Sequence, residues 1–252
     1  MTNDAKSEWA AIVLAAGRGK RMGGDRAKVL HEVAGRPMIS WVIDAARGAG
    51  ATKVIAVVGY AKETVIAALP EGVDHAVQEV PQGTGDAVRA ASAHLEGWRG
   101  NVWVLCGDVP GTSAGTLRGL AGLHEQSGAS ATLLTMELED PKRYGRVIRD
   151  GNGRVARIVE FADATDDERA VKELNSGTYA FSAPDLLEAL PRLSNDNAQG
   201  EYYLTDVIGI MIADGKTVAA HKTNDPRECM GGDTPEALAA IESAWPAGCG
   251  EK

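Results

Sequence analysis

Cysteine and long apolar runs are scarce in this chain. The three cysteines, Cys106, Cys229 and Cys249, are odd in number and widely spaced, which argues against both a disulfide framework and a zinc site. No apolar run approaches the ~20 residues that cross a bilayer, and the N-terminal stretch 1–8 is polar rather than signal-like. We therefore expect reduced thiols and a cytoplasmic protein with no membrane partner.

Positively charged residues are also fewer than negatively charged ones. Lysine and arginine number 26 against 35 aspartate and glutamate residues, so the formal net charge is −9. The chain also lacks the aromatic-rich basic stripe that is typical of nucleic-acid-binding proteins. We expect no nucleic-acid partner, and any nucleotide that the protein holds should be a small free one.

The first half of the sequence alternates apolar strands with helices. A chain of 252 residues can bury one large α/β core. Strands are expected at 10–15, 53–58, 74–78, 101–105 and 129–137, and helices at 37–48, 62–69, 85–94 and 113–126. Pro37 suits the first turn of its helix, Gly48 the end of that helix, and Ser113 an N-cap. This pattern predicts a doubly wound, mainly parallel, Rossmann-like sheet.

The second half departs from this alternation. Two short strands at 147–149 and 155–160 flank a glycine-rich turn, and a long strand is expected at 171–181. We interpret them as an antiparallel β insertion that forms a second wall of a cleft. Helices at 183–190, 204–214 and 235–245 and a strand at 217–221 complete one domain over residues 9–245. The ends, 1–8 and 246–252, are expected to be flexible.

The most informative stretch begins where the first apolar strand, Trp9–Leu14, ends. Small residues and two glycines follow, so backbone N–H groups can approach phosphate oxygens closely and form an anion-binding nest. Cations are concentrated around that turn: Arg18, Lys20, Arg21 and Lys28. The combination favours a nucleoside triphosphate, and the alternative is an ordinary loop with a solvated basic patch.

Two common phosphate motifs do not fit this turn. The P-loop string G-x-x-x-x-G-K-[ST] does not occur in the chain. The dinucleotide fingerprint requires a glycine where Met22 stands, and the strand Val54–Val58 is followed by Gly59-Tyr60, with no acidic residue to hold a ribose. NAD binding is therefore not expected.

Asp108 follows another apolar strand and should lie at a carboxyl end of the sheet, where ligands of open α/β folds collect. That position favours a metal ligand. The alternative is a turn aspartate before Pro110.

Several motifs occur together in a family-like order. The first is Leu14-Ala-Ala-Gly-Arg-Gly-Lys-Arg-Met22, followed by Lys28-Val-Leu-His31. The later ones are Gln82–Gly85, Gly107–Pro110, Tyr144–Arg146, Ile158–Glu160, Glu173–Gly177 and Asn197–Asp206. From about residue 9 to residue 245 the chain resembles the sugar-nucleotide pyrophosphorylases, most closely their N-acetylglucosamine-1-phosphate uridyltransferase branch.

The resemblance implies a reaction. UMP would pass from UTP to N-acetylglucosamine 1-phosphate, giving UDP-N-acetylglucosamine and pyrophosphate, with Mg²⁺ as cofactor and these small molecules as partners. In bifunctional relatives an acetyltransferase domain of left-handed β-helix repeats follows. No such repeat follows Trp245, so we expect none here.

The resemblance also assigns roles to residues of the phosphate and base subsites. Arg21 and Lys28 would be catalytic, neutralising the β- and γ-phosphates and the α-phosphate respectively. Asp108 and Asp233 would bind the metal. The nucleotide would contact Leu14, Ala15, Ala16, Gly17 and Gly19, and its base would be recognised by Gln78, Gly83 and Thr84.

A second group of matched positions would hold the sugar. Its members come from the strand end at 106–107, the expected antiparallel wall and the long motif near residue 200: Cys106, Gly107, Gly145, Glu160, Asn175, Tyr203 and Thr205.

The chain departs from the family pattern at a few positions. Ala27 replaces the usual proline before Lys28, Asp86 replaces a common histidine, Cys106 replaces a frequent tyrosine, and Phe161-Ala162 stands where relatives often carry a polar residue and a lysine. Asp233 aligns with an asparagine of the branch, and an alternative role for it, or for Thr234, is to cap the helix that begins at Pro235.

Two other functions remain open from the sequence. One is a related pyrophosphorylase that uses another sugar phosphate, a phosphorylated alcohol or dTTP. The other is a noncatalytic nucleotide-binding sensor, although a sensor would not need Arg21, Lys28, Asp108 and Asp233 together.

Overall fold

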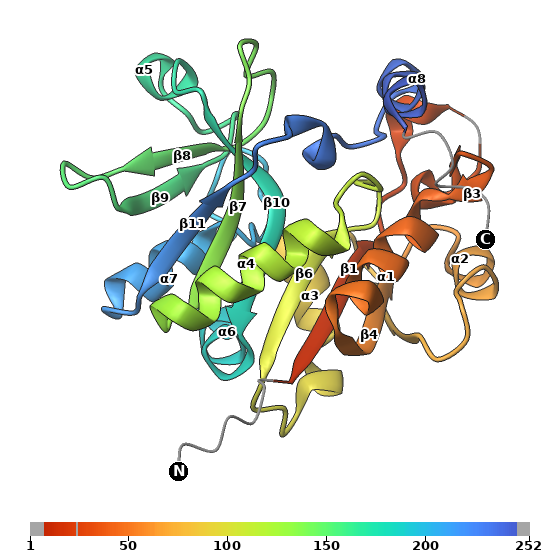
Figure 1. Cartoon of the computed structure of the whole chain (residues 1–252), viewed down its shortest axis with the longest axis horizontal. Helices are drawn as coiled ribbons and strands as arrows, with labels where there is room; N and C mark the ends of the chain where they lie inside the picture. The colour runs from red at the N-terminus through yellow and green to blue at the C-terminus, as the bar shows by residue number, and fades with distance from the viewer. Residues whose placement is uncertain (1–7, 24, 246–252) are drawn as a thin grey trace.

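The computed structural model describes residues 8–23 and 25–245, so the chain ends at 1–7 and 246–252 lie outside the described residues. Its centre is a nine-stranded sheet in the order β11-β7-β10-β6-β1-β4-β5, with the β8–β9 hairpin attached through β10 (Figure 1). Strands β1, β4, β5 and β6 run parallel. The strands are β1 (Trp9–Ala15), β4 (Ala51–Val58), β5 (Asp74–Val77), β6 (Asn101–Cys106), β7 (Ala131–Glu137), β8 (Arg146–Arg149), β9 (Val155–Val159), β10 (Glu173–Ser182) and β11 (Val218–Lys222).

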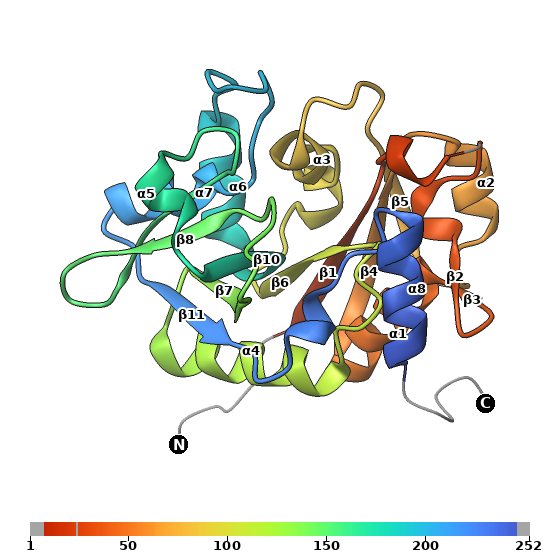
Figure 2. The ribbon, with the colours of Figure 1, turned by 90° about the horizontal axis from the view of Figure 1, so that it is seen from above.

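Helices cover both faces of the sheet, as expected for a doubly wound α/β fold (Figure 2). One face packs against α3 (Thr84–Ala90), α6 (Ala183–Ala189) and α7 (Asp206–Ala213), and the other against α1 (Met38–Ala49), α2 (Lys62–Ala67) and α4 (Ala114–Ser127). Successive residues of β1 alternate between the two cores: Ala10 and Ile12 join the first, and Ala11 and Val13 the second. Because both faces are buried, the strand is apolar throughout.

Strand β10 joins the parallel part of the sheet to the antiparallel wall. Its second half pairs antiparallel with β6 and β7, and its first half pairs with β7 and β8. The register shifts between Asn175 and Tyr179, where Gly177 adopts a φ of +80°. The β10 bulge, residues 175–179, turns the strand where the two parts of the sheet meet. The expected antiparallel insertion is confirmed, although half of β10 belongs to the main sheet.

Some elements differ from the sequence-based expectation. The helix expected at 85–94 divides into α3 and a 3-10 turn at Ser92–Leu95, and α1 ends at Ala49 rather than Gly48 because Gly50 takes the left-handed C-cap position. Ser113 caps α4 as expected, and its Oγ accepts a hydrogen bond from Thr116 N–H at 3.1 Å. A short helix, α5 (Asp166–Arg169), lies between β9 and β10 and begins with a capping box. No element was expected in this stretch, which lies between the strands predicted at 155–160 and 171–181.

Helix α8 (Pro235–Ala244) packs on a two-stranded ribbon formed by β2 (Glu32–Val33) and β3 (Arg36–Pro37). The Trp41 and Trp245 rings lie 4.9 Å apart, and Ala34 N–H donates to Glu242 Oε1 at 3.0 Å. This packing fixes the helix that follows Asp233. No helix in the described part of the chain is long and apolar enough to span a membrane.

The most deeply buried large side chain suggests a test of the fold. Trp103 is fully buried and stacks on Trp9 with ring centroids 4.1 Å apart. Trp103→Ala should lower the free energy of unfolding by about 3–5 kcal/mol because it removes a large apolar surface and leaves a cavity. Urea unfolding followed by circular dichroism measures this change in the free energy of unfolding. Val80, 59% exposed, is the control, and Val80→Ala should change stability by less than ~0.5 kcal/mol. Equal stability of the two variants would contradict this packing.

Candidate active site

The site is built at the carboxyl edge of the sheet, where β1 and β6 end. Gly107 N–H donates to the Leu14 carbonyl at 2.9 Å, and a Cβ at Gly107 would lie 2.9 Å from the same oxygen. Gly19 has a φ of +65°, and a Cβ there would lie 2.7 Å from Lys28 Cβ. A side chain at either position would clash with these atoms, so both positions require glycine. They bring the turn after β1 against Lys28 and the loop after β6.

Two cation–carboxylate pairs lie at this edge. Lys28 Nζ lies 2.6 Å from Asp108 Oδ2, and the two side chains are 21% and 14% exposed. Arg21 lies 2.7 Å from Asp233 Oδ2 in a more exposed pair. The structure thus joins the four residues expected to neutralise phosphate and bind metal, although they come from distant parts of the chain.

The surroundings of Lys28 and Cys106 set their protonation states. Burial alone would lower the pKa of Lys28, but the adjacent Asp108 carboxylate outweighs it, and the pKa is raised. Burial, reinforced by Asp108, raises the pKa of the Cys106 thiol to about 12. Lys28 therefore remains a cation, and Cys106 remains a neutral thiol at physiological pH, which agrees with its interpretation as a strand residue rather than a nucleophile.

Gly232 brings the chain just before Asp233 against Asp108. Gly232 N–H donates to the Asp108 carbonyl at 2.8 Å, and a Cβ on Gly232 would lie 2.5 Å from Met38 Sδ. The N-cap of α8 is Thr234, whose hydroxyl accepts from Ala237 N–H at 3.1 Å. Because Thr234 caps the helix, the Asp233 carboxylate is available for Arg21 or for a metal ion.

The donor set at this edge fits a magnesium ion. Within the described residues no group of three or more His, Cys, Asp or Glu side chains is arranged to hold a metal. Mg²⁺ does not need one, because one or two carboxylates commonly hold it while substrate phosphates and water complete its shell. Asp108 and Asp233 are the two carboxylates that would hold such an ion. Gly231, whose missing Cβ would lie 3.5 Å from Asp108 Oδ2, leaves space beside the first of them.

A second loop, residues 78–86, lies beside the long motif near residue 200. Gly85 N–H donates to the Tyr202 carbonyl at 2.8 Å, and Leu204 N–H donates to Thr84 Oγ1 at 3.0 Å. Gln78 is 7% exposed, and its Nε2 donates to the Gly83 carbonyl at 3.0 Å. The three residues expected to contact the base therefore lie in one loop, held by hydrogen bonds to residues 202–204.

The expected sugar residues converge on the antiparallel wall. A Cβ on Gly145 would lie 3.4 Å from Glu160 Oε2 and 3.6 Å from Asn175 Cβ, and Asn175 N–H donates to the Gly145 carbonyl at 2.9 Å. Asn175 Nδ2 donates to the Tyr179 hydroxyl at 2.6 Å, so this amide also supports the β10 bulge. Thr205 Oγ1 donates to Glu160 Oε1 at 3.1 Å. Burial raises the pKa of Glu160, and the nearby carboxylates of Asp206, Asp163 and Glu201 add to the rise.

Two residues of this wall were not assigned a role from sequence. Asp163 accepts from Ala198 N–H at 2.8 Å and from the Tyr203 hydroxyl at 3.2 Å, joining the turn after Glu160 to the loop before Tyr203. Arg146, 2% exposed, donates to the carbonyls of Tyr144, Lys142 and Arg169. Arg146 belongs to the matched motif Tyr144–Arg146, so the sequence did mark it as a candidate. The partners of Asp163 are 35 and 40 residues away, and no local pattern predicts them.

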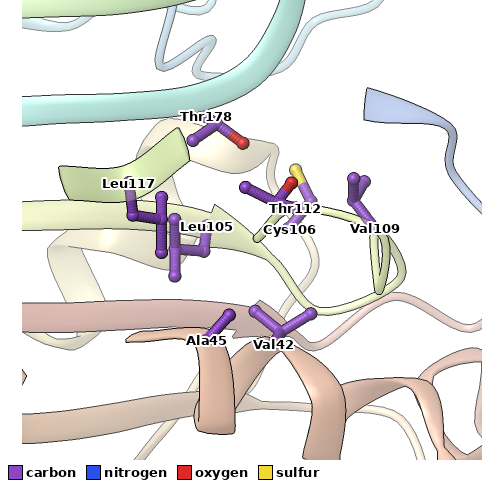
Figure 3. Close-up of a pocket in the computed structure, with 8 residues that line it drawn as sticks. All are labelled: Val42, Ala45, Leu105, Cys106, Val109, Thr112, Leu117 and Thr178. Carbon is purple, nitrogen blue, oxygen red and sulfur yellow. The ribbon is translucent and has the colours of Figure 1, made fainter. Parts of the chain in front are cut away.

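Cys106 links the two halves of the site. Its thiol lies 3.5 Å from the Gly177 carbonyl in the β10 bulge. Beneath it lies a small interior space bordered by Val42, Leu105 and Thr178 (Figure 3), too narrow to admit a water molecule. That space is part of the core between the sheet and helices α1 and α4. It is not a ligand pocket.

Comparisons with known proteins place the chain in a family. A family model described as a MobA-like NTP transferase domain matches residues 11–207. The bifunctional protein GlmU of Geobacter metallireducens is 48% identical over 226 residues, which are 89% of this chain and 48% of that protein. The bifunctional protein GlmU of Pelotomaculum thermopropionicum is 47% identical over 235 residues, 93% of this chain and 51% of that protein.

The chain thus spans about half the length of the curated relatives that it matches. The matches confirm the resemblance found in the motifs and the mixed, mainly parallel α/β fold. Because the family model covers well over half of the sequence and the relatives align with nearly all of it, the chain belongs to the MobA-like NTP transferase family and is a nucleotidyltransferase.

Proposed function

We propose that the protein transfers UMP from UTP to N-acetylglucosamine 1-phosphate, releasing pyrophosphate. The observation that carries this proposal is the pairing of Lys28 with Asp108 and of Arg21 with Asp233 at the carboxyl edge of the sheet. Two cations and two carboxylates beside a glycine turn suit a triphosphate and a divalent metal together. The matched motifs and the similarity to GlmU proteins support the choice of substrates.

The reaction needs charge neutralisation more than acid–base chemistry. A phosphate oxygen of the sugar 1-phosphate attacks the α-phosphorus of UTP, the bond between that phosphorus and the bridging oxygen to the β-phosphate breaks, and pyrophosphate leaves. The attacking phosphate is already ionised near neutral pH, so no general base is required. Lys28 holds the α-phosphate and the incoming phosphate together, and Arg21 presents a forked donor to the leaving pyrophosphate.

The two ion pairs also explain how a metal is accommodated. Each of the two carboxylates is paired with one cation, Asp108 with Lys28 and Asp233 with Arg21. When the triphosphate binds, its charge attracts Arg21 and Lys28, and Asp108 and Asp233 become free to hold Mg²⁺. A magnesium ion held there would supply positive charge that stabilises the charge developing as pyrophosphate leaves.

The sugar lies against the antiparallel wall in this proposal. Glu160 is a buried acceptor, Gly145 carries no side chain beside its Oε2, and Thr205 donates a hydrogen bond to its carboxylate. Asn175 adds a side-chain amide that is only partly used by Tyr179 and Gly177. An acetamido sugar has an N–H and hydroxyls to donate to such a wall.

A substrate panel tests the proposal. Pyrophosphate release should be measured with UTP, dTTP, CTP, ATP and GTP, each with the 1-phosphates of N-acetylglucosamine, glucosamine and glucose. UTP with N-acetylglucosamine 1-phosphate should give the highest kcat/KM, exceeding glucose 1-phosphate by on the order of 10²-fold because buried polar groups lose their partner. Equal efficiency for these two sugars would remove the N-acetylglucosamine assignment. Tight nucleotide binding with no pyrophosphate release would instead indicate a sensor.

Replacing one carboxylate tests the metal assignment. Asp108→Asn should lower kcat by on the order of 10²-fold or more with an unchanged circular dichroism spectrum, because a neutral amide is a poor ligand for a hard cation. Asp167, exposed on α5, provides the matched control Asp167→Asn, which should keep full activity. Near-normal turnover of Asp108→Asn with Mg²⁺ would exclude Asp108 from the metal site.

The raised pKa of Glu160 predicts a pH dependence. Because burial raises this pKa, the carboxylate gains its proton at a higher pH than an ordinary glutamate, and it loses acceptor capacity as pH falls toward that value. The KM for the sugar 1-phosphate should therefore rise between pH 8 and pH 5. Glu160→Gln should raise this KM at pH 8, and the remaining pH dependence of KM should be that of the substrate phosphate alone. Identical pH profiles for the two proteins would contradict the role of Glu160.

A further inference from the structure

The side-chain amide of Gln78 is held by two acceptors. Gln78 directly follows β5, and its Nε2 donates to the Gly83 carbonyl at 3.0 Å and to Asp86 Oδ2 at 2.7 Å. A primary amide has two N–H groups, and here each has a partner within the protein. Within the described part of the chain, no donor contacts Gln78 Oε1.

These two partners determine which way the amide faces. A backbone carbonyl and a carboxylate can accept hydrogen bonds but have none to donate. Rotating the amide by 180° would place Oε1 against both of them and would replace two attractions with two repulsions. The nitrogen is therefore directed toward Gly83 and Asp86, and Oε1 is the polar side-chain atom of Gln78 that is left for a ligand.

The backbone keeps this arrangement in place. Gln78 N–H donates to the Val58 carbonyl at 2.8 Å, which ties the residue to β4. Gly83 has a φ of +110°, and a Cβ there would lie 2.5 Å from the Tyr202 carbonyl, so the turn cannot shift toward that loop. Asp86 lies in the first turn of α3, where a carboxylate is favoured by the helix dipole.

We propose that Asp86 is a positioning residue that selects the nucleotide base by fixing the Gln78 amide with its oxygen outward. The inference rests on the proposed function, in which the base lies against Gln78. An outward acceptor matches the N3–H of uracil or thymine. It opposes cytosine, whose N3 is itself an acceptor. The chain would thus favour a pyrimidine with an imide N–H. The residue responsible is Asp86, which stands where the family commonly has a histidine.

The size of the effect follows from hydrogen-bond chemistry. A site whose polar atom meets another acceptor, with no water to intervene, discriminates strongly, so UTP should exceed CTP in kcat/KM by on the order of 10²-fold. Asp86→Asn replaces an obligatory acceptor with an amide that can also donate, so the Gln78 amide is no longer confined to one orientation. Asp86→Ala removes one of its two anchors.

The test measures a ratio rather than an activity. kcat/KM for UTP, dTTP and CTP should be determined with saturating sugar 1-phosphate for the unmodified protein, Asp86→Asn and Asp86→Ala. The UTP to CTP ratio should fall about tenfold in both variants, while dTTP changes in parallel with UTP. Glu79 lies in the same segment and pairs with Lys62 at 3.1 Å. Glu79→Gln has the same charge change as Asp86→Asn and should leave the ratio unchanged.

Other outcomes would overturn the inference. A loss of activity in the Asp86 variants that is equal for UTP and CTP would show a structural role only. An equal fall of the UTP to CTP ratio in Glu79→Gln would also overturn the inference, because the change of charge alone would then explain the fall. Calorimetric titrations of UTP and CTP give the same ratio from binding, so the inference is decided even if no turnover occurs. Absence of turnover with every nucleotide would count against the proposed function, whereas turnover with an unchanged ratio would count against Asp86 alone.

Discussion

The pairing of Lys28 with Asp108 is the interaction on which the site depends. Both side chains are mostly buried at the carboxyl edge of the sheet, where an isolated charge would be costly and a paired one is retained. The pair requires that the turn after β1 and the loop after β6 approach closely, which Gly19 and Gly107 permit. An acidic protein thereby keeps cations where the proposed triphosphate would need them, and Lys28 and Arg21 each have an acidic neighbour.

The rest of the site extends from this edge through β10. Its bulge carries Asn175 toward Gly145 and brings the Gly177 carbonyl to Cys106, so the phosphate side and the sugar side share one strand. The loop before α7 completes the enclosure, since Tyr202 contacts the Gly83–Gly85 turn and Thr205 contacts Glu160. In the proposed function, the base, phosphate and sugar subsites are thus connected through β10 and the loop before α7.

Much of this could be predicted from the sequence where the signal is local. The continuous apolar run from Trp9 to Leu14 predicted a strand in the middle of a parallel sheet, and small residues followed by cations predicted the turn after it. The capping box at Thr165 and Glu168 is also a local pattern, but the helix that it begins has only four residues, and no element was predicted between the expected strands at 155–160 and 171–181. Contacts across the chain carried no such signal. The bonds of Gln78 to Asp86 and of Asp163 to Tyr203 depend on how loops fold back, which periodicity and spacing do not determine.

Metal binding that depends on the nucleotide tests the central claim, that the two carboxylates exchange their cations for a metal when a triphosphate binds. Mn²⁺ can replace Mg²⁺ as a probe, and electron paramagnetic resonance measures its free concentration. The account predicts one tightly bound Mn²⁺ per chain in the presence of UTP, and a clear loss of affinity in Asp233→Asn under the same conditions. Binding of Mn²⁺ and UTP that is unchanged when both Asp108 and Asp233 are replaced by asparagine would contradict it.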